Sequence, residues 1–170
     1  LPCRNTSKIC IFTDTGNLHQ LKMLDVPLCR PRDKGIPIEN ICNYDSSKES
    51  VCFMESFENL SGKHLLFVTK NAMVKQVPSE TVVSTKLTEK DQLLFVGIAE
   101  KDSVVLLTSE NRILKFKMDD ISILKKASVG VRGMKLVEGE QIKEVFCVDS
   151  NESFIIKPGK KKINLSDIKL

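Results

Sequence analysis

The sequence has few histidines, which are common metal ligands, and no long apolar run of the kind that spans a membrane. Its 170 residues include no tryptophan, one tyrosine and two histidines. None of its six cysteines forms the C-x-x-C pair of common zinc sites. The longest apolar run, residues 93–99, is far shorter than the roughly 20 residues of a membrane-spanning helix. We therefore expect neither a metal site nor a transmembrane segment.

Signals for catalysis are missing as well. The phosphate-loop patterns G-x-G-x-x-G and G-x-x-x-x-G-K-[ST] do not occur between a strand and a helix, and no local signature selects a Cys-His nucleophile. Asp119 and Asp120 fall at a turn, where acids are common. The sequence therefore predicts no catalytic residue, no cofactor and no small-molecule substrate for this chain.

The composition is that of a folded chain. With 41% hydrophobic residues, 28% charged residues and a mean hydropathy of -0.11, there is enough apolar surface for a core. Cys10, Cys52 and Cys147 lie in apolar runs, where a thiol packs as a small hydrophobe. The first residues lack both an initiator methionine and the apolar stretch of a secretory signal. We expect a reducing compartment and a chain excised from a longer protein.

Four segments of the chain resemble one another: residues 9–26, 65–82, 104–121 and 154–168. Thr13, Thr69 and Thr108 coincide in the first three, at a spacing near the roughly 40 to 50 residues of propeller blades. Each segment opens with an apolar run, which predicts a strand buried on both faces. A turn motif follows in each case, DTGN, TKNA, SENR or KPGK, and predicts a hairpin.

The second strand of each hairpin is predicted to alternate between buried and solvated positions. One aligned column is apolar in all four segments: Leu21, Val77, Phe116 and Ile163. The neighbouring column is polar and is expected to face solvent: Gln20, Gln76, Lys115 and Lys162.

A second internal similarity joins residues 33–41 to residues 128–136, with Gly35 aligned to Gly130. We expect Gly35, Gly130 and Gly133 to permit tight bends or close backbone approach rather than to bind a ligand. A further apolar strand follows near residues 50–55, 93–99 and 143–148, so each repeat has about four short strands. Helix signals are almost absent. The predicted fold class is all-β, an open or incomplete propeller-like array whose repeats span about 8–56, 63–100, 103–149 and, in part, 152–170.

The motifs resemble a known family, the C-terminal β-pinwheel domain of the A subunit of bacterial type IIA topoisomerases, which covers gyrase and topoisomerase IV. The resemblance is carried by FTDTGNLHQLKMLDVP, RPRDKGIPIENI, ASVGVRGMKLVEGEQI and KINLSDI, and it extends over nearly the whole chain. The glycine-rich basic box of gyrase A subunits is not found in these residues. The resemblance implies a single C-terminal DNA-binding domain whose basic outer rim binds and bends duplex DNA without reading its sequence.

The same resemblance implies the wider setting. The breakage-reunion tyrosine of the family lies in an N-terminal region that does not match this chain, and Tyr44 is expected to be a loop residue. The parent protein would be an ATP-dependent type II topoisomerase in the cytoplasm, at the nucleoid, and its A and B subunits would be the protein partners. ATP and magnesium would belong to that holoenzyme and not to this chain.

The net charge of +4 is mild, so the distribution of bases must indicate where DNA would bind. Affinity for DNA without sequence readout comes from lysines and arginines spaced along a surface, which release the counterions of the phosphates. Repeat position and resemblance together select these candidates: Lys22, Arg30, Arg32, Lys34, Lys75, Lys115, Lys117, Arg132, Lys135, Lys160, Lys161 and Lys162.

A different class of function remains open at this stage. An incomplete array exposes strand edges, which favour docking of a protein partner or self-association. In this alternative the chain is a propeller-type protein interaction module that does not bind DNA, and its lysines are ordinary solvated surface.

Overall fold

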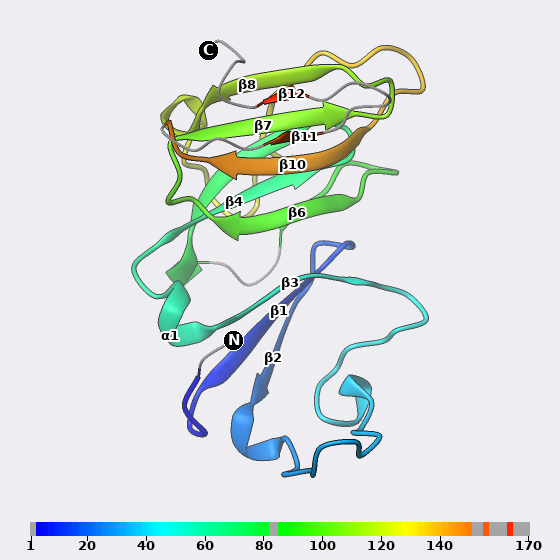
Figure 1. The fold of residues 1–170 in the computed structure, drawn as a ribbon, viewed down its shortest axis with the longest axis vertical. Helices are drawn as coiled ribbons and strands as arrows, with labels where there is room; N and C mark the ends of the chain where they lie inside the picture. Colours follow the sequence, from blue (N-terminus) through cyan, green and yellow to red (C-terminus); the bar gives the residue numbers. More distant parts are fainter. Residues whose placement is uncertain (1–2, 82–84, 151–154, 157–162, 165–170) are drawn as a thin grey trace.

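The computed structural model describes residues 3–81, 85–150, 155–156 and 163–164. Most regular elements in them are strands, and the strands form three antiparallel sheets and a short hairpin. We call the sheets blades I, II and III in chain order. Figure 1 shows blade I in blue to cyan, with the two later blades packed together above it.

Blade I has the strand order β2-β1-β3, formed by Lys8–Thr13 (β1), Leu18–Lys22 (β2) and Val51–Ser56 (β3). A long loop joins β2 to β3 and projects from this blade (Figure 1). The loop contains two short 3-10 helices, Met23–Asp25 and Ile38–Asn40. A four-residue helix, α1 (Phe57–Leu60), follows β3, capped by the Ser56 side chain, which accepts a hydrogen bond from the Asn59 N–H.

Blade II is the only four-stranded sheet among the described residues, with the order β6-β4-β5-β9. Its strands are His64–Thr69 (β4), Met73–Pro78 (β5), Leu93–Ile98 (β6) and Val131–Arg132 (β9). Blade III has the order β10-β7-β8, formed by Ser103–Thr108 (β7), Ile113–Lys117 (β8) and Ile142–Val148 (β10). The short hairpin is Ile155–Ile156 (β11) with Ile163–Asn164 (β12), and the remaining 3-10 helices are Ser79–Thr81 and Met118–Asp120.

The first two strands of blades I, II and III are joined by the same kind of turn. Gly16, Ala72 and Asn111 all have a positive φ, between 59° and 83°. Each donates its backbone N–H to the carbonyl of the repeated threonine three residues earlier, at 2.9–3.1 Å. In blades II and III the threonine hydroxyl also accepts the N–H of the residue four positions later, Met73 or Arg112, at 3.1 Å. The left-handed position therefore recurs even where glycine is replaced by alanine or asparagine.

The strand β9 follows blade III's first two strands in the chain but pairs with β5 in blade II. Its approach depends on glycine, because a Cβ atom on Gly130 would lie 2.8 Å from the carbonyl oxygen of Val74. A Cβ atom on Gly133 would lie equally close to the Val74 side chain. The expected close approach is thus confirmed at Gly130 and Gly133. At Gly35, the equivalent position in blade I, no atom lies within 4 Å of the added Cβ.

The core lies between the blades. Alternate residues of β4 face opposite ways: Leu65 and Phe67 pack toward blade I, and Leu66 and Val68 pack toward blade III. The first strand of each blade is almost entirely buried, as its continuous apolar sequence predicts. Both β3 and β10 contact β6, so the third strands meet one another while β2, β9 and β8 lie at the opposite edges of their sheets.

The all-β array predicted from the repeats is confirmed, including its almost complete lack of helix. One detail of the alternation is wrong. Gln76 is buried rather than solvated, and its side-chain amide donates hydrogen bonds to the carbonyls of Met118 (2.8 Å) and Ile121 (3.3 Å). The reason is that β5 is an interior strand, covered by neighbouring blades on both faces. Lys162, in the same column, lies outside the described residues.

Candidate nucleic-acid interface

The exposed candidate cations lie on the outer edges of the blades or in the loops beside them. Lys22 is exposed at the end of β2, Lys117 at the end of β8 and Arg132 on β9. Lys115 is partly buried on β8. Among the described residues β2, β8 and β9 are all edge strands, so these bases lie at the edge of each blade opposite its third strand.

Three further candidates form a tight turn in the projecting loop of blade I. Arg30, Arg32 and Lys34 are all exposed. Asp33 shapes the turn, since its carboxylate accepts the Arg30 N–H at 2.7 Å and its own N–H donates to the Arg30 carbonyl at 3.1 Å. Arg32 adopts a positive φ of 80°. We call residues 30–34 the first basic turn.

An equivalent turn precedes β9. The Ser128 N–H donates to the Lys125 carbonyl at 2.9 Å, as the Asp33 N–H does in the first basic turn. Lys125 and Lys126 are exposed, and Arg132 follows on β9. Sequence reasoning did not select Lys125 or Lys126, although both lie in the stretch that aligns with Arg30 and its neighbours. We call residues 125–130 the second basic turn.

Lys75 does not belong to the exposed set, which corrects the sequence-based assignment. Its side chain is only 2% exposed. The ammonium donates hydrogen bonds to the backbone carbonyls of Lys126 (3.1 Å) and Ser128 (2.5 Å) and lies 5.7 Å from the centre of the Phe67 ring. Burial lowers the pKa of this lysine to about 8. A phosphate at the surface cannot reach it.

Lys135 is exposed beside β9, close to an ion pair that sequence reasoning missed. The Arg112 guanidinium binds both carboxylate oxygens of Glu140 and also donates to the Lys135 carbonyl at 2.9 Å. Arg112 is therefore held by a carboxylate. Lys160, Lys161 and Lys162 lie outside the described residues.

A buried acid lies beside the hairpin of each of the three blades, and sequence reasoning did not identify these acids. Glu49, Asp91 and Glu140 each stand two residues before the third strand of their blade. The Glu49 carboxylate accepts hydrogen bonds from the hydroxyls of Thr13 (2.7 Å) and Thr15 (3.0 Å). Asp91 accepts the N–H of Asn71 at 3.1 Å. The signal was available, because the acids recur at the same offset in all three repeats.

Two of these acids, Glu49 and Glu140, have lowered pKa values. Burial raises the pKa of Glu49, but hydrogen bonds from Thr13, Asn17 and Thr15 outweigh it and lower the pKa to about 2. The hydrogen bond from Arg112 lowers the pKa of Glu140 to about 2 as well. Both carboxylates are therefore charged at neutral pH and hold the hairpin turns near the outer edges.

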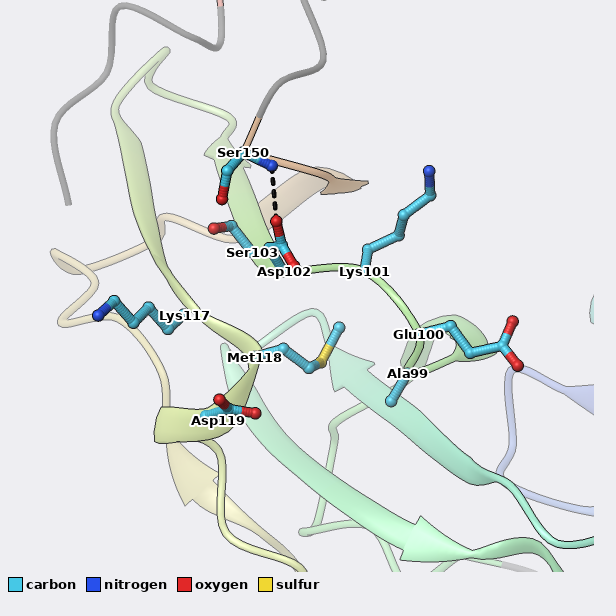
Figure 2. Close-up of a pocket in the computed structure, with 9 residues that line it drawn as sticks. All are labelled: Ala99, Glu100, Lys101, Asp102, Ser103, Lys117, Met118, Asp119 and Ser150. Carbon is cyan, nitrogen blue, oxygen red and sulfur yellow. Dashed lines mark hydrogen bonds between the residues drawn. The ribbon is translucent and has the colours of Figure 1, made fainter.

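A polar hollow of about 410 Å³ lies where the β6–β7 loop meets the end of β8 (Figure 2). Lys101 and Lys117 line it, but Figure 2 shows their amines pointing away from one another. Three carboxylates, those of Glu100, Asp102 and Asp119, share the lining. The hollow therefore lacks the converging positive charge that would hold a phosphate.

Within the described residues, no group of three or more His, Cys, Asp or Glu side chains is arranged to hold a metal ion. In the same part of the chain, no helix is long and apolar enough to cross a membrane. All six cysteines are free thiols, and Cys10 is buried while Cys52 and Cys147 are partly buried.

Comparison with known proteins supports the resemblance seen in the motifs. A family model described as the DNA gyrase C-terminal domain, beta-propeller, matches residues 63–90 and 102–149. The gyrase A subunits of Klebsiella oxytoca and Lawsonia intracellularis are 24% and 27% identical over 143 and 147 residues, covering 79% and 81% of this chain. The matched region is 16% and 18% of those proteins, so the chain spans less than a fifth of their length.

Solved structures agree with the fold. The C-terminal domain of DNA topoisomerase IV superposes with a TM-score of 0.78 at 26% identity, covering 89% of this chain and 50% of that one. The DNA gyrase A C-terminal domain superposes with a TM-score of 0.65 at 21% identity, covering 90% and 51%. In its motifs, its sheets and its matched relatives, the chain is therefore similar to the C-terminal domains of DNA gyrase A subunits and of DNA topoisomerase IV.

Proposed function

We propose that this chain is an accessory module of a type IIA topoisomerase A subunit that binds and bends duplex DNA without reading its sequence. The observation that carries the proposal is the recurrence of exposed bases at equivalent outer positions, above all the first and second basic turns. Bases repeated along an edge contact successive phosphates of one duplex, and such contacts supply sequence-independent affinity.

The role is geometric. Bending a 20 to 30 base-pair segment costs on the order of 1 to 6 kcal/mol, so several phosphate contacts must act together. The bent duplex is presented for strand passage by the rest of the A subunit and by the B subunit, in the cytoplasm at the nucleoid. The parent is an ATP-dependent topoisomerase whose ATP and magnesium act outside this chain, and the chain itself contributes no catalytic residue.

Fluorescence anisotropy with a mixed-sequence duplex of about 40 base pairs, across a salt series, tests the proposal. We expect binding that weakens steeply with salt and does not depend on sequence. The triple variant Arg30→Glu, Arg32→Glu and Arg132→Glu should lower the magnitude of the slope of log K against log salt by about 0.9 for each phosphate that the variant no longer binds.

The matched control reverses three exposed lysines outside the two basic turns: Lys86, Lys90 and Lys143. This control changes net charge by the same amount but should leave most of the slope in place. Equal losses in the two triple variants would show that net charge alone attracts DNA. Absence of binding at low salt would refute the proposed function.

A protein interaction module is the second candidate, favoured by the apolar character of the projecting loop. A cavity of about 400 Å³ lies beside that loop, lined mostly by apolar side chains that include Leu21, Val26, Ile36 and Ile38. Leu28 is fully exposed in the same loop. Docking of a protein on this surface would persist at high salt, whereas binding of DNA would not.

A further inference from the structure

The buried ammonium of Lys75 lies inside the second basic turn, and the path of the backbone explains why. Gln76 bonds to the chain arriving from blade III: its N–H donates to the Ser122 carbonyl at 3.1 Å and its carbonyl accepts the Leu124 N–H at 2.8 Å. That contact is a parallel bridge between Gln76 and Ile123. The arriving chain therefore runs in the same direction as β5.

The chain then reverses and returns along the same strand in the opposite direction. Val131 pairs antiparallel with Val74, and the Gly133 N–H donates to the Ala72 carbonyl at 2.8 Å. Lys75 stands between the two pairing regions, and residues 125–130 form the reversal around it. Two carbonyls of this reversal, those of Lys126 and Ser128, point at the Lys75 ammonium.

This arrangement solves a problem of backbone polarity. A reversal beside a buried strand leaves carbonyl groups that would otherwise be unpaired, and an unpaired buried acceptor destabilises the folded chain. An ammonium is a strong donor with three N–H groups and can serve two carbonyls at once. The two hydrogen bonds partly compensate for the desolvation of the ammonium. The nearby face of the Phe67 ring stabilises the buried charge further.

We propose that Lys75 is a positioning residue that fixes the second basic turn, so that Lys125, Lys126 and Arg132 face the DNA together. This inference rests on the proposed function and adds Lys125 and Lys126 to the DNA-contacting set. The residue acts only through the backbone of residues 126 and 128, because its own side chain is buried.

The first measurement is amide hydrogen exchange on the variant Lys75→Met, which removes the donor and keeps the length of the side chain. The amides of Val131 and Gly133 should lose protection, while those of β4 and β6 keep theirs. Lys143→Met is the matched control, since Lys143 is exposed on β10, and it should change neither region. Unchanged protection of Val131 and Gly133 in Lys75→Met would overturn the proposed anchoring. This arm does not depend on DNA.

The second measurement is a double-mutant cycle in DNA binding. Lys75→Met alone should lower the magnitude of the salt slope by about 1 to 2 units, since loss of position weakens the hold on more than one phosphate. In the background Lys125→Glu, Lys126→Glu and Arg132→Glu, the same change should have no further effect on affinity. An equal loss in both backgrounds would overturn the positioning role.

The outcomes separate the two proposals. If the wild-type chain fails to bind DNA while Lys75→Met still releases the Val131 and Gly133 amides, the proposed function fails and the anchoring stands. If Lys75→Met does not fold, Lys75→Gln is used, because its amide can donate to the same carbonyls without a charge. In Lys75→Gln the amides of Val131 and Gly133 should lose only part of their protection. Complete loss of their protection would show that the anchoring requires the charge as well as the hydrogen bonds.

Discussion

At the scale of single residues, lysine has two different roles in this chain. Lysines in the two basic turns are exposed, whereas Lys75 is buried and serves the backbone. The carboxylates divide in the same way, since Glu49 and Glu140 are buried against hairpin turns while Glu110 is exposed. The number of charged residues in the composition is therefore larger than the number of charged side chains that a partner can contact at the surface.

The buried carboxylates predict how the free energy of unfolding changes with pH in the acidic range. The pKa of Glu49 is about 2 in the folded chain, below the ordinary value of 4.5, so the folded state binds fewer protons than the unfolded state between these values. The stabilisation is complete above pH 4.5 and is lost as pH falls toward 2. Urea unfolding at a series of pH values should show a shallower acid decline for Glu49→Gln. Glu110→Gln, at an exposed position, should follow the wild type.

Lys75 predicts a second rise of stability with pH, in the alkaline range. Its pKa is about 8 in the folded chain and near 10.5 when exposed, so the unfolded state binds more protons between these values. Stability contributed at this site should rise from pH 8 to 10.5, by on the order of 1 kcal/mol or more. Cysteine thiols also titrate in alkali. The difference in unfolding free energy between wild type and Lys75→Met, measured at each pH, cancels their contribution and leaves that of Lys75. A difference independent of pH would contradict the low pKa.

At the scale of elements, the distinctive feature is β9, a strand that completes the sheet of the preceding repeat. It is only two residues long, so its place depends on the glycines on either side and on the Lys75 anchor. Gly130 has a φ of 108° and faces the backbone of Val74. Any side chain there meets both backbone strain and a steric conflict.

Gly130→Ala is therefore expected to displace β9 and to destabilise the chain by about 1 to 3 kcal/mol. Gly35→Ala is the matched control, since Gly35 also has a positive φ, 66°, but has open space around the added methyl group. The control should cost no more than about 1 kcal/mol. Thermal unfolding compares the two, and equal losses would show that strain alone, without the clash at Val74, determines the cost.

Much of this level was predictable from the sequence. The recurrence of Thr13, Thr69 and Thr108 predicted the hairpin of each of the three blades, because a turn that closes on a threonine needs that residue at a fixed place. The partner of β9 was not predictable, since periodicity describes a strand and not the sheet it joins. The burial of Gln76 was not predicted for a related reason: an alternating pattern assigns one solvated face, whereas β5 is covered on both faces.

At the scale of the whole molecule, the chain is a stack in which each blade buries its faces on its neighbours. Leu66, Val104 and Leu106 belong to one cluster between blades II and III, and Phe12 and Leu65 to another between blades I and II. Stability in such arrays is close to a sum of units and interfaces between neighbours. Damage at one interface should therefore be felt locally first.

Leu106→Ala tests this description. Leu106 is 0% exposed between blades II and III, and the cavity left by truncation should cost about 2 to 5 kcal/mol. Hydrogen exchange should show the loss of protection first in β7, β8 and β10 and least in β1. Leu24→Ala, at a position that is 68% exposed, should change stability by less than about 0.5 kcal/mol. Uniform loss across all blades would contradict a stack of local units.

The exchange of β9 also bears on how such arrays grow and shrink over evolutionary time. The stretch of sequence that repeats and the set of strands that form one sheet are offset, because blade II borrows its last strand from the following repeat. Duplication or deletion of one repeat therefore alters two sheets at once, because the strand equivalent to β9 must pair with the sheet of whichever repeat precedes it. A lineage that changes its number of blades must preserve this junction, so Val74, Gly130 and Gly133 should vary together.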